Sequence, residues 1–538
     1  MNVTIYSIIF TILLLVLFLG TGWYGKTKTK NLDDFYVGGR GISVFTNSWA
    51  QLANICSLST FMGFTGMMFG AQFMLVYLVA AWMFGIYLMS VLVAPYVRRS
   101  KKYTTAEFLS ARFEDKNIRM ISVVFIIWIC VLYMFAQMKG TGHIFEIMFG
   151  IPYEWGVIIG GLVVVFYVAI GGMLGASNNQ AIQGLVLYFT FLIPLGVIMY
   201  KIGASNPLPA FGYSNLIPTL LQNFPDYFNP FMLAGKYKIE LRWYIAVLIG
   251  PCTLGLISLP HVVMRFFTSK TTQDARKMMV WTNFFYLFLS WSTFAAGFVG
   301  SYLIATKGLN VPTKEMDKVL FIINQNFNPD WVLALVLAGA LCAAFSTCAG
   351  LLMVIGSSIA FDISSFLNIN LDNAKAKKLA FFTILIAGLI IIAISLKPPA
   401  FLLVSIIWAQ ATSAAVFGPA LVLSIWWKGA TPAGAKASML VGGISMFILF
   451  ILSAIGWKPY FWGGPIGFAK TSLFTVSLSF IVLILVSSYR GKPGENLKKL
   501  VDEIHGWKSY KEERYYNKIL PSSITCLSFL FIIWFFIP

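Results

Sequence analysis

The sequence predicts an all-α polytopic membrane protein with about 14 transmembrane helices in a single domain. Of its 538 residues, 58% are hydrophobic and only 11% are charged. Uninterrupted apolar stretches of about 20 residues recur along the chain, and each is long enough to cross a bilayer as a helix. The links between them are short. The two longest, residues 203–242 and 489–518, are too short for an added catalytic or signalling domain.

Fourteen segments have the length and apolarity that a membrane helix requires. In chain order they are residues 4–22, 43–70, 72–97, 120–148, 154–175, 180–202, 243–264, 278–305, 331–361, 379–396, 399–427, 432–456, 471–488 and 519–537. Because the number of spans is even, both termini are expected to lie on the same side of the membrane.

The distribution of basic residues predicts the orientation of the chain. The first apolar run has no Lys or Arg before it and no small-residue cleavage pattern after it, which predicts an uncleaved first helix. With the N-terminus outside, the inner loops and adjoining helix ends hold 28 of the 39 Lys and Arg residues. This asymmetry follows the positive-inside rule, so we expect a multi-pass protein of the cell membrane with both termini outside.

The same asymmetry accounts for most of the net charge of +19, so no nucleic-acid partner is needed to explain it. The basic residues of the segment 489–518 are expected to contact lipid head groups. The six cysteines show no CxxC and no Cys/His cluster with metal spacing. No histidine pairs with a carboxylate at a suggestive spacing, and no carboxylate lies at a predicted midplane. The pattern does not indicate an enzyme, and no organic cofactor is expected.

Neutral oxygen atoms gather in two of the predicted spans. The second span carries amide and hydroxyl side chains between residues 54 and 60, and the ninth contains the stretch CAAFSTCAG at 342–350. In a helix, the Ala343 carbonyl and the hydroxyls of Ser346 and Thr347 lie within one turn, because they are three and four residues apart. A hard cation prefers oxygen ligands. This stretch can therefore supply part of a cation site, with the remaining oxygens from an unwound helix nearby.

Two spans are candidates for such unwinding. Gly250–Pro251 predicts a break in the seventh span, because proline removes a donor and clashes with the preceding turn. Interrupted helices at corresponding positions of two halves indicate a transporter site. The second and seventh spans therefore predict a five-plus-five inverted repeat, with repeat one at about 43–202 and repeat two at about 243–427. The peripheral helices are then 4–22, 432–456, 471–488 and 519–537.

A packing role is the alternative interpretation of each polar residue taken singly. Gly, Ala, Ser and Thr are common where membrane helices pack closely. A single hydroxyl can also return its hydrogen bond to a carbonyl three or four residues earlier. Gly250–Pro251 could form only a kink. The coincidence of polar positions in the second, seventh and ninth spans favours a binding site.

Four stretches resemble motifs of the sodium:solute symporter family, in the family's order and spacing. They are NLDDFYVGGRG at 31–41, ANICSLSTFMGFTG at 53–66, GGMLGASNNQAIQG at 171–184 and AAFSTCAGLLMVIGSSIAFD at 343–362. The resemblance covers nearly the whole chain. It implies a leucine-transporter-type fold that binds sodium between the first and eighth core helices, which are spans 2 and 9 here.

Matched motif by motif, the resemblance implies a set of sodium (Na+) ligands and makes sodium the expected coupling ion. The ligands would be the carbonyls of Ala53, Cys56 and Ala343 and the hydroxyls of Ser346 and Thr347. Many family members carry an Asp at the position of Gln180, and the second span contains no acidic residue. The site is therefore less negative than in those relatives.

The solute class is suggested by the stretch LPHVVMRFFTSKTTQDARK at 259–277, which resembles the acetate and short-monocarboxylate branch of the family. Free N–H groups at a helix break can hold an anion without a buried Arg or Lys. An uncharged or zwitterionic solute fits the same features. Polar residues of the fourth and eleventh spans are added by position alone, with interhelical bonding as their alternative role. The expected solute-binding residues are Asn54, Ser57, Gln137, Thr141, Gly250, Cys252, Thr253, Trp408, Gln410 and Thr412.

We therefore expect a secondary active transporter that carries sodium together with a small organic solute, such as acetate, by alternating access. A proton-coupled symporter of the same fold and a sodium symporter for an amino acid or a sugar stay open as alternatives. A membrane solute sensor is a more remote one, because no long inner C-terminal output domain is present. The sequence does not indicate an oligomeric state and is compatible with a monomer.

Overall fold

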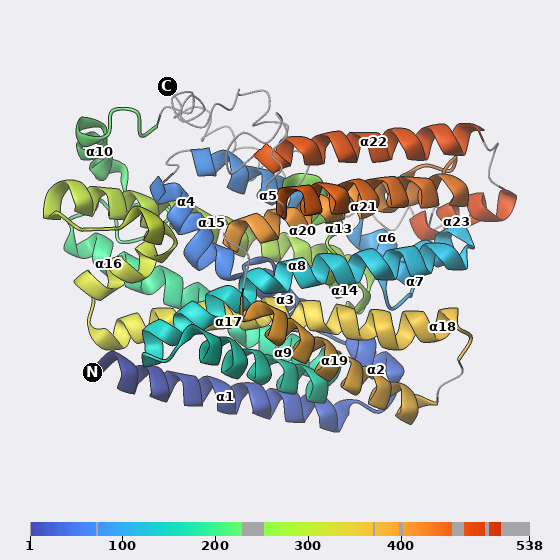
Figure 1. Ribbon diagram of the computed structural model, residues 1–538, viewed down its shortest axis with the longest axis horizontal. Coiled ribbons are helices and arrows are strands. Elements are labelled where there is room, and N and C mark those ends of the chain that lie inside the picture. Colours follow the sequence, from blue (N-terminus) through green and yellow to red (C-terminus); the bar gives the residue numbers. More distant parts are fainter. Residues whose placement is uncertain are drawn as a thin grey trace.

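A computed structural model describes residues 2–70, 74–228, 252–369, 372–397, 402–454, 467–489 and 494–506. These residues form helices and loops, with one isolated parallel bridge between Ile42 and Ser269. Long helices run roughly along the long axis of the molecule (Figure 1). Nine of the described helices are long and apolar enough to cross a membrane, or ten if one bent pair is a single span. The all-helical membrane class is confirmed, whereas the predicted count of 14 spans is not.

The chain consists of long helices that are connected by shorter helices and turns. The first half contains α1 (Asn2–Lys28), α2 (Leu32–Val37), α3 (Val44–Ile55), η2 (Ser59–Phe64), α4 (Thr65–Gly70), α5 (Met74–Leu92), α6 (Ala94–Arg99), α7 (Thr105–Phe113), α8 (Lys116–Phe149), α9 (Tyr153–Lys201) and α10 (Ile217–Asn223). The second half contains α13 (Gly255–Ser258), α14 (Pro260–Phe267), α15 (Thr272–Lys307), η5 (Thr313–Lys318), α16 (Val319–Phe327), α17 (Asp330–Ser357), η6 (Ser358–Ile363), α18 (Ser364–Phe366), α19 (Asn373–Ser395), α20 (Leu402–Trp426), α21 (Pro432–Ala454), α22 (Gly467–Tyr489) and α23 (Glu495–His505). Short 3₁₀ turns lie at Gly38–Arg40 and Ser214–Leu216.

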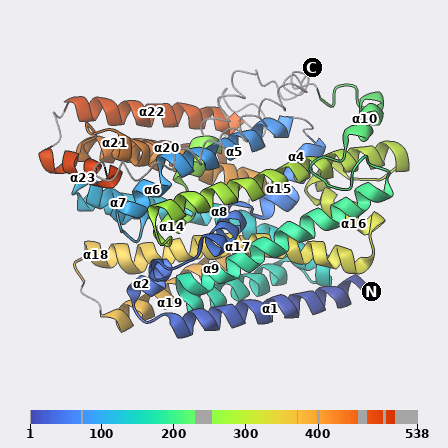
Figure 2. The same ribbon diagram turned by 180° about the vertical axis from the view of Figure 1, so that it is seen from behind.

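The short helices separate into two groups. α2, α7, α18 and α23 lie at one end of the molecule, and α10 and α16 lie at the other, as the front and back views agree (Figures 1 and 2). The loops at the first end contain most of the basic residues that the positive-inside rule assigns to the inner side. Following the orientation that these charges predict, we refer to this end as the inner end and to the opposite one as the outer end.

The second predicted span is a broken helix. α3 ends at Ile55, and the chain resumes as helix at Ser59 with a bend of 56°. Cys56 has φ −78° and ψ 77°, outside the helical region. The Ser57 hydroxyl accepts a hydrogen bond from the backbone N–H of Ser59 at 3.3 Å. Serine favours such a break because its side chain offers the backbone a local alternative to helical bonding.

The seventh predicted span is also broken. Leu259 has φ −58° and ψ 121°, which separates α13 from α14. The cause is Pro260, since the residue before a proline is pushed out of the α region. The break predicted at Gly250–Pro251 lies outside the described residues, as does the predicted span 519–537.

The segment α9 consists of two helices that are joined at Gly172 without an intervening loop. Gly172 has φ 56° and ψ −161°, which no helix accommodates. The Gln183 amide nitrogen lies 3.3 Å from the Tyr167 hydroxyl, although 16 positions separate the two residues. Sixteen residues of uninterrupted helix would span about 24 Å at 1.5 Å per residue. Gly172 therefore joins two antiparallel helices, in agreement with the predicted spans 154–175 and 180–202.

α17 lies at the centre of the bundle and packs against α9, α8, α3 and α1. Every residue from 336 to 357 in it is buried. Many of these are Ala, Gly, Ser or Cys, and such small residues let neighbouring backbones approach closely. At Gly350, for example, a Cβ atom would lie 2.2 Å from the Asn54 side-chain oxygen. Close packing of this kind brings α17 against the break that follows α3.

Candidate functional site

Backbone and side-chain oxygens converge where α17 meets the end of α3. The Ser346 hydroxyl lies 2.8 Å from the Ala53 carbonyl oxygen and 3.0 Å from that of Ala343. The Thr347 hydroxyl lies 3.4 Å from the Asn54 carbonyl oxygen and 3.3 Å from that of Ala343. All five residues are fully buried. The structure thus brings four of the five predicted sodium ligands into mutual contact and adds the carbonyl of Asn54.

The break after α3 explains why these carbonyls are available. In an uninterrupted helix, the N–H groups of Ser57 and Leu58 would bond to the carbonyls of Ala53 and Asn54. Here Ser57 donates to the Ile55 carbonyl at 3.0 Å, and Leu58 donates to the Gln137 side-chain oxygen at 3.1 Å. The helix end therefore leaves both carbonyls to the hydroxyls of α17.

Cys56, the fifth predicted ligand, is the first residue of the break. Its helical donor would be the N–H of Thr60, which instead bonds to the Ser57 carbonyl at 2.9 Å. The Cys56 carbonyl is thus freed in the same way as its neighbours. Uncharged carbonyl and hydroxyl oxygens at this spacing fit a hard monovalent cation, which needs several oxygen ligands but little negative charge.

Gln180 borders this group of oxygens on the α9 side. Its amide nitrogen donates to the Ser346 carbonyl at 2.5 Å and lies 3.4 Å from the Asn54 side-chain oxygen. Its own oxygen is buried without a hydrogen-bond partner. No group of three or more His, Cys, Asp and Glu that could hold a metal ion occurs among the described residues. The oxygens named above belong to carbonyl, hydroxyl and amide groups, which carry no net charge.

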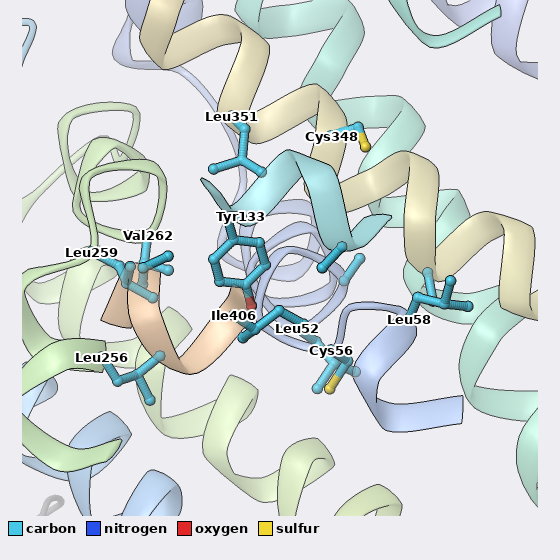
Figure 3. Close-up of a cluster of buried hydrophobic side chains, with 14 of the residues drawn as sticks. Leu52, Cys56, Leu58, Tyr133, Leu256, Leu259, Val262, Cys348, Leu351 and Ile406 are labelled. Carbon is cyan, nitrogen blue, oxygen red and sulfur yellow. The ribbon is translucent and has the colours of Figure 1, made fainter. Parts of the chain in front are cut away.

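A small cavity lies beside these oxygens, between the two broken helices. Its free volume of about 10 Å³ is room for about one water molecule. Figure 3 shows Tyr133 of α8 between Leu259 and Val262 on one side and Leu52 and Cys56 on the other. The lining contains no Asp, Glu, Lys or Arg; it consists of Ile55, Ser59, Phe64, Trp82, Tyr133, Leu256, Leu259, His261, Val262, Tyr286, Ile406 and Gln410. A solute bound here must be small, or the surrounding helices must separate to admit it.

His261 contributes an imidazole ring to this lining. It is fully buried, and neither ring nitrogen has a hydrogen-bond partner. Its ring packs edge-on against Tyr133, with centroids 5.2 Å apart. The predicted solute-binding set omits His261. The available signal was Pro260, because a proline-induced break directs the following residue to the start of a new helix.

Hydrogen bonds connect the two broken helices across the cavity. The Asn54 amide donates to the His261 carbonyl at 2.9 Å, and the Gln51 amide donates to the Val262 carbonyl at 3.2 Å. The backbone carbonyl of Asn54 also contacts the Thr347 hydroxyl. A movement of α14 is therefore expected to move Asn54 and to change this contact. This arrangement gives a direct physical link between the cation site and the cavity.

The predicted solute-binding residues have different places in the structure. Gln410 lines the cavity and accepts a hydrogen bond from the Trp82 indole at 3.0 Å. The Gln137 side-chain oxygen accepts a hydrogen bond from the backbone N–H of Leu58 in the break after α3, and its amide nitrogen has no partner. Ser57 lies within the break, where its hydroxyl is 2.7 Å from that of Ser59. These residues, with Asn54, border the cavity or the cation site.

The other members of that set lie elsewhere. The hydroxyls of Thr141 and Thr412 bond to carbonyls of their own helices at 2.8 Å. The Thr253 hydroxyl bonds to the Ala81 carbonyl at 3.0 Å, which joins two helices. Cys252 and Trp408 are buried but are not among the cavity-lining residues, and Gly250 lies outside the described residues.

Close contacts lie on both sides of this cavity along the bundle. At the inner end, Arg98 donates to the carbonyls of Ser269 and Lys270, and the Asn47 amide donates to the Thr268 hydroxyl at 2.9 Å. At the outer end, η5 packs on α4 so closely that a Cβ at Gly66 would lie 2.8 Å from the Met316 carbonyl. An all-helical bundle with two broken helices, neutral oxygens and an enclosed central cavity has the features of a secondary transporter.

The chain matches the Sodium:solute symporter family over residues 35–442 and belongs to that family. It is 27% identical over 505 residues to the uncharacterized symporter YwcA of Bacillus subtilis (strain 168), covering 89% of this chain and 93% of that one. It is 26% identical over 448 residues to the osmoregulated proline transporter OpuE of the same strain, covering 79% and 85%. Family membership confirms the resemblance in the motifs, but the acetate branch is not confirmed.

Two solved structures show that the fold is shared. One is a Na+-coupled sialic acid symporter in a substrate-bound outward-open state, with a TM-score of 0.74, 17% identity and coverage of 91% of this chain and 99% of that one. The other is MhsT in complex with L-phenylalanine, with a TM-score of 0.53, 13% identity and coverage of 81% and 98%. The family and the fold are those of transporters, and the fold is of the leucine-transporter type.

Proposed function

We propose that this protein carries sodium together with a small carboxylate-bearing solute by alternating access. The contact between the α17 hydroxyls and the freed carbonyls after α3 is the observation that carries the proposal, because it offers a hard cation uncharged oxygens from two helices. One charge that moves through 100 mV releases about 2.3 kcal/mol, so inward sodium movement can drive solute accumulation.

The chemistry of the cavity supports a solute that carries a carboxylate. α14 begins at Pro260, and the N-terminal end of a helix favours an anion. His261 follows directly and has two ring nitrogens without partners. Because the free volume is room for about one water molecule, the helices must separate to admit any organic solute, and a short monocarboxylate such as acetate requires the smallest separation. Proline is the second candidate, because it also carries a carboxylate and a relative is a proline transporter.

Uptake into proteoliposomes under an imposed sodium gradient tests the coupling. We expect labelled solute to accumulate when sodium is high outside and not when potassium replaces it. A proton gradient imposed in place of the sodium gradient should give no accumulation. Accumulation with the proton gradient alone would instead support the proton-coupled alternative.

Competition identifies the solute. Unlabelled acetate, propionate, pyruvate, lactate, proline, other amino acids and sugars are each added to an assay that detects sodium-dependent uptake. We expect compounds with a carboxylate to compete and sugars not to compete. Competition by sugars alone would contradict the assignment of a carboxylate-binding cavity while leaving sodium coupling intact.

A further inference from the structure

A second cavity lies at the inner end of the molecule, away from the central site. It has a volume of about 260 Å³, which is room for a phosphate group and several waters. Its lining residues come from α6, α7, α23 and the loop after α6, and these three helices lie near one another at the inner end (Figure 2). Its polar lining consists of Arg99, Ser100, Lys102, Arg112 and Glu503. Three cations and one carboxylate therefore face a space that the transport path does not use.

Arg112 is the unusual member of this lining. Its side chain is 1% exposed, and its Nε donates to the Ser424 carbonyl at 2.7 Å near the end of α20. Its two terminal nitrogens are buried without hydrogen-bond partners. Burial lowers the pKa of Arg112 to about 10, so the guanidinium stays charged at neutral pH. A buried cation without a carboxylate partner is costly unless something else neutralises it.

The other charged residues of the lining differ in their partners. Lys102 has only a long contact, 3.9 Å, to the Glu107 carboxylate. Arg99 donates to the carbonyls of Ile504 and His505 at the end of α23. Glu503 is the one carboxylate in the lining. Among the side chains of the lining, positive groups therefore outnumber carboxylates three to one.

We propose that this cavity binds a phosphate-bearing anion, held by Arg112 and Lys102. The guanidinium fork of arginine matches the geometry of phosphate oxygens and binds them with two parallel hydrogen bonds. The source of the phosphate is either the head group of an anionic membrane lipid or a soluble phosphate. α23 buries Leu497, Val501 and Ile504 against the bundle, so the bound anion would fasten this helix to α7 and α20.

Purified full-length protein with two probes distinguishes the sources. The first probe is inorganic phosphate added to protein in a neutral detergent, with chloride at equal ionic strength as the reference. The second is a nanodisc of phosphatidylglycerol, with phosphatidylcholine as the reference. The rise in thermal unfolding midpoint and the lipid retained by native mass spectrometry are the readouts. We expect at least one probe to bind to the wild-type protein in preference to its reference.

Four variants test the assignment. We expect Arg112→Gln and Lys102→Gln each to weaken binding about tenfold, as the loss of one charge-assisted hydrogen bond would. Glu503→Gln removes the carboxylate of the lining and should strengthen binding. Lys499→Gln is the matched control, because it removes an exposed positive charge on α23 outside the cavity. Lys102→Gln and Glu503→Gln keep the test decisive if Arg112→Gln fails to fold.

The outcomes separate the possibilities. Lipid binding with no effect of free phosphate identifies a head-group site, and the reverse identifies a soluble anion. The proposal is overturned if neither probe binds, if Lys499→Gln weakens binding as much as Arg112→Gln, or if Glu503→Gln leaves binding unchanged. In those cases Arg112 serves only to cap α20.

Discussion

At the scale of single residues, two hydroxyls of α17 define the proposed cation site. Ser346 and Thr347 reach carbonyls on both α3 and their own helix. We expect the double variant Ser346→Ala and Thr347→Val to raise the sodium concentration for half-maximal uptake more than tenfold, because two oxygen ligands worth over 1.4 kcal/mol together are removed. Sodium-titrated uptake in proteoliposomes measures this.

A matched control separates ligand loss from a general effect on packing. Ser122 is also a fully buried membrane-helix serine, and its hydroxyl bonds to the Ile118 carbonyl of its own helix at 2.7 Å. Ser122→Ala should leave the sodium dependence within about twofold of wild type. The substitution removes one hydrogen bond inside a single helix, and the net free energy of such a bond is small. Equal sodium dependence in the double variant and in Ser122→Ala would refute the assigned ligands.

His261 is expected to contact the solute. His261→Phe keeps the ring that packs on Tyr133 but removes both nitrogens. If one nitrogen bonds to the solute, the KM for the solute should rise about tenfold while the affinity for sodium stays within about twofold. Initial-rate uptake at varied solute concentration measures the KM. His143→Phe, a substitution of a partly exposed histidine on α8, is the control, and an equal KM in both variants would exclude a solute contact.

At the scale of helices, close approach between α17 and α3 is a condition for the site. A Cβ at Gly350 would lie 2.2 Å from the Asn54 side-chain oxygen, whereas a Cβ at Gly418 of α20 has no neighbour within 4 Å. We expect Gly350→Ala to destabilise the protein by about 1–3 kcal/mol through overpacking and to weaken sodium binding. Gly418→Ala should be neutral or stabilising by up to about 1 kcal/mol. Thermal unfolding with and without sodium compares the two, and similar behaviour would show that the α3–α17 contact is not tight.

The helices also show what could be predicted from the sequence. Ala343, Ser346 and Thr347 are three and four positions apart, so any helix places them within one turn. Their proximity could therefore be predicted from the sequence alone. The break after α3 was predictable from the polar residues that compete with helical bonding. The cavity walls were not, because aromatic residues such as Trp82 and Tyr133 have the same pattern whether they face lipid or a cavity.

Long-range contacts account for the remaining differences. The fold-back of α9 at Gly172 agrees with two predicted spans. By contrast, Thr141 and Thr412 were chosen by position, and a hydroxyl that bonds within its own helix has no sequence signal that distinguishes it from one that faces a solute. Which face of α8 or α20 meets the cavity depends on the packing of α8 against α17, of α20 against α13 and of the two helices against each other, and this is not encoded in either helix alone.

At the scale of the whole molecule, the outer closure contains a titratable group. Asp317 of η5 has a buried side-chain oxygen without a hydrogen-bond partner and lies against Gly66 of α4. Burial raises its pKa to about 6, and the positive charge of Lys139 partly opposes this rise. The folded protein therefore holds a proton that the unfolded chain releases near pH 4, so this group stabilises the closed outer end at low pH.

This stabilisation should be lost as the pH rises through about 6. We expect the thermal unfolding midpoint of wild type to fall between pH 5 and pH 7 by more than that of Asp317→Asn, which cannot ionise. Asp226→Asn removes an exposed carboxylate and should retain the wild-type pH dependence. An identical pH profile in Asp317→Asn and wild type would show that the buried carboxyl does not contribute.

Alternating access requires the inner closure to open, and Arg98 is its strongest polar connection. It joins α6 to the carbonyls of Ser269 and Lys270 after α14. Loss of two charge-assisted hydrogen bonds should shift the population toward an inward-open state at least about tenfold in Arg98→Gln. A Ser269→Cys reporter, labelled by a membrane-impermeant thiol reagent in inside-out vesicles, detects this opening. The five described native cysteines are all buried.

The Ser269→Cys reporter should react several-fold faster in the Arg98→Gln background than in the wild-type background. Sodium added to the medium, which the inner end faces in these vesicles, should slow both reactions because bound sodium holds α3 and α17 together. Lys436→Gln is the matched control: it breaks an inner-end ion pair with Asp115 that is not part of the closure. If Lys436→Gln accelerates labelling as much as Arg98→Gln, loss of any inner positive charge loosens the protein and Arg98 has no specific role. If neither variant changes the rate, the inner end is held by apolar packing, and the polar contacts of Arg98 only follow its movement.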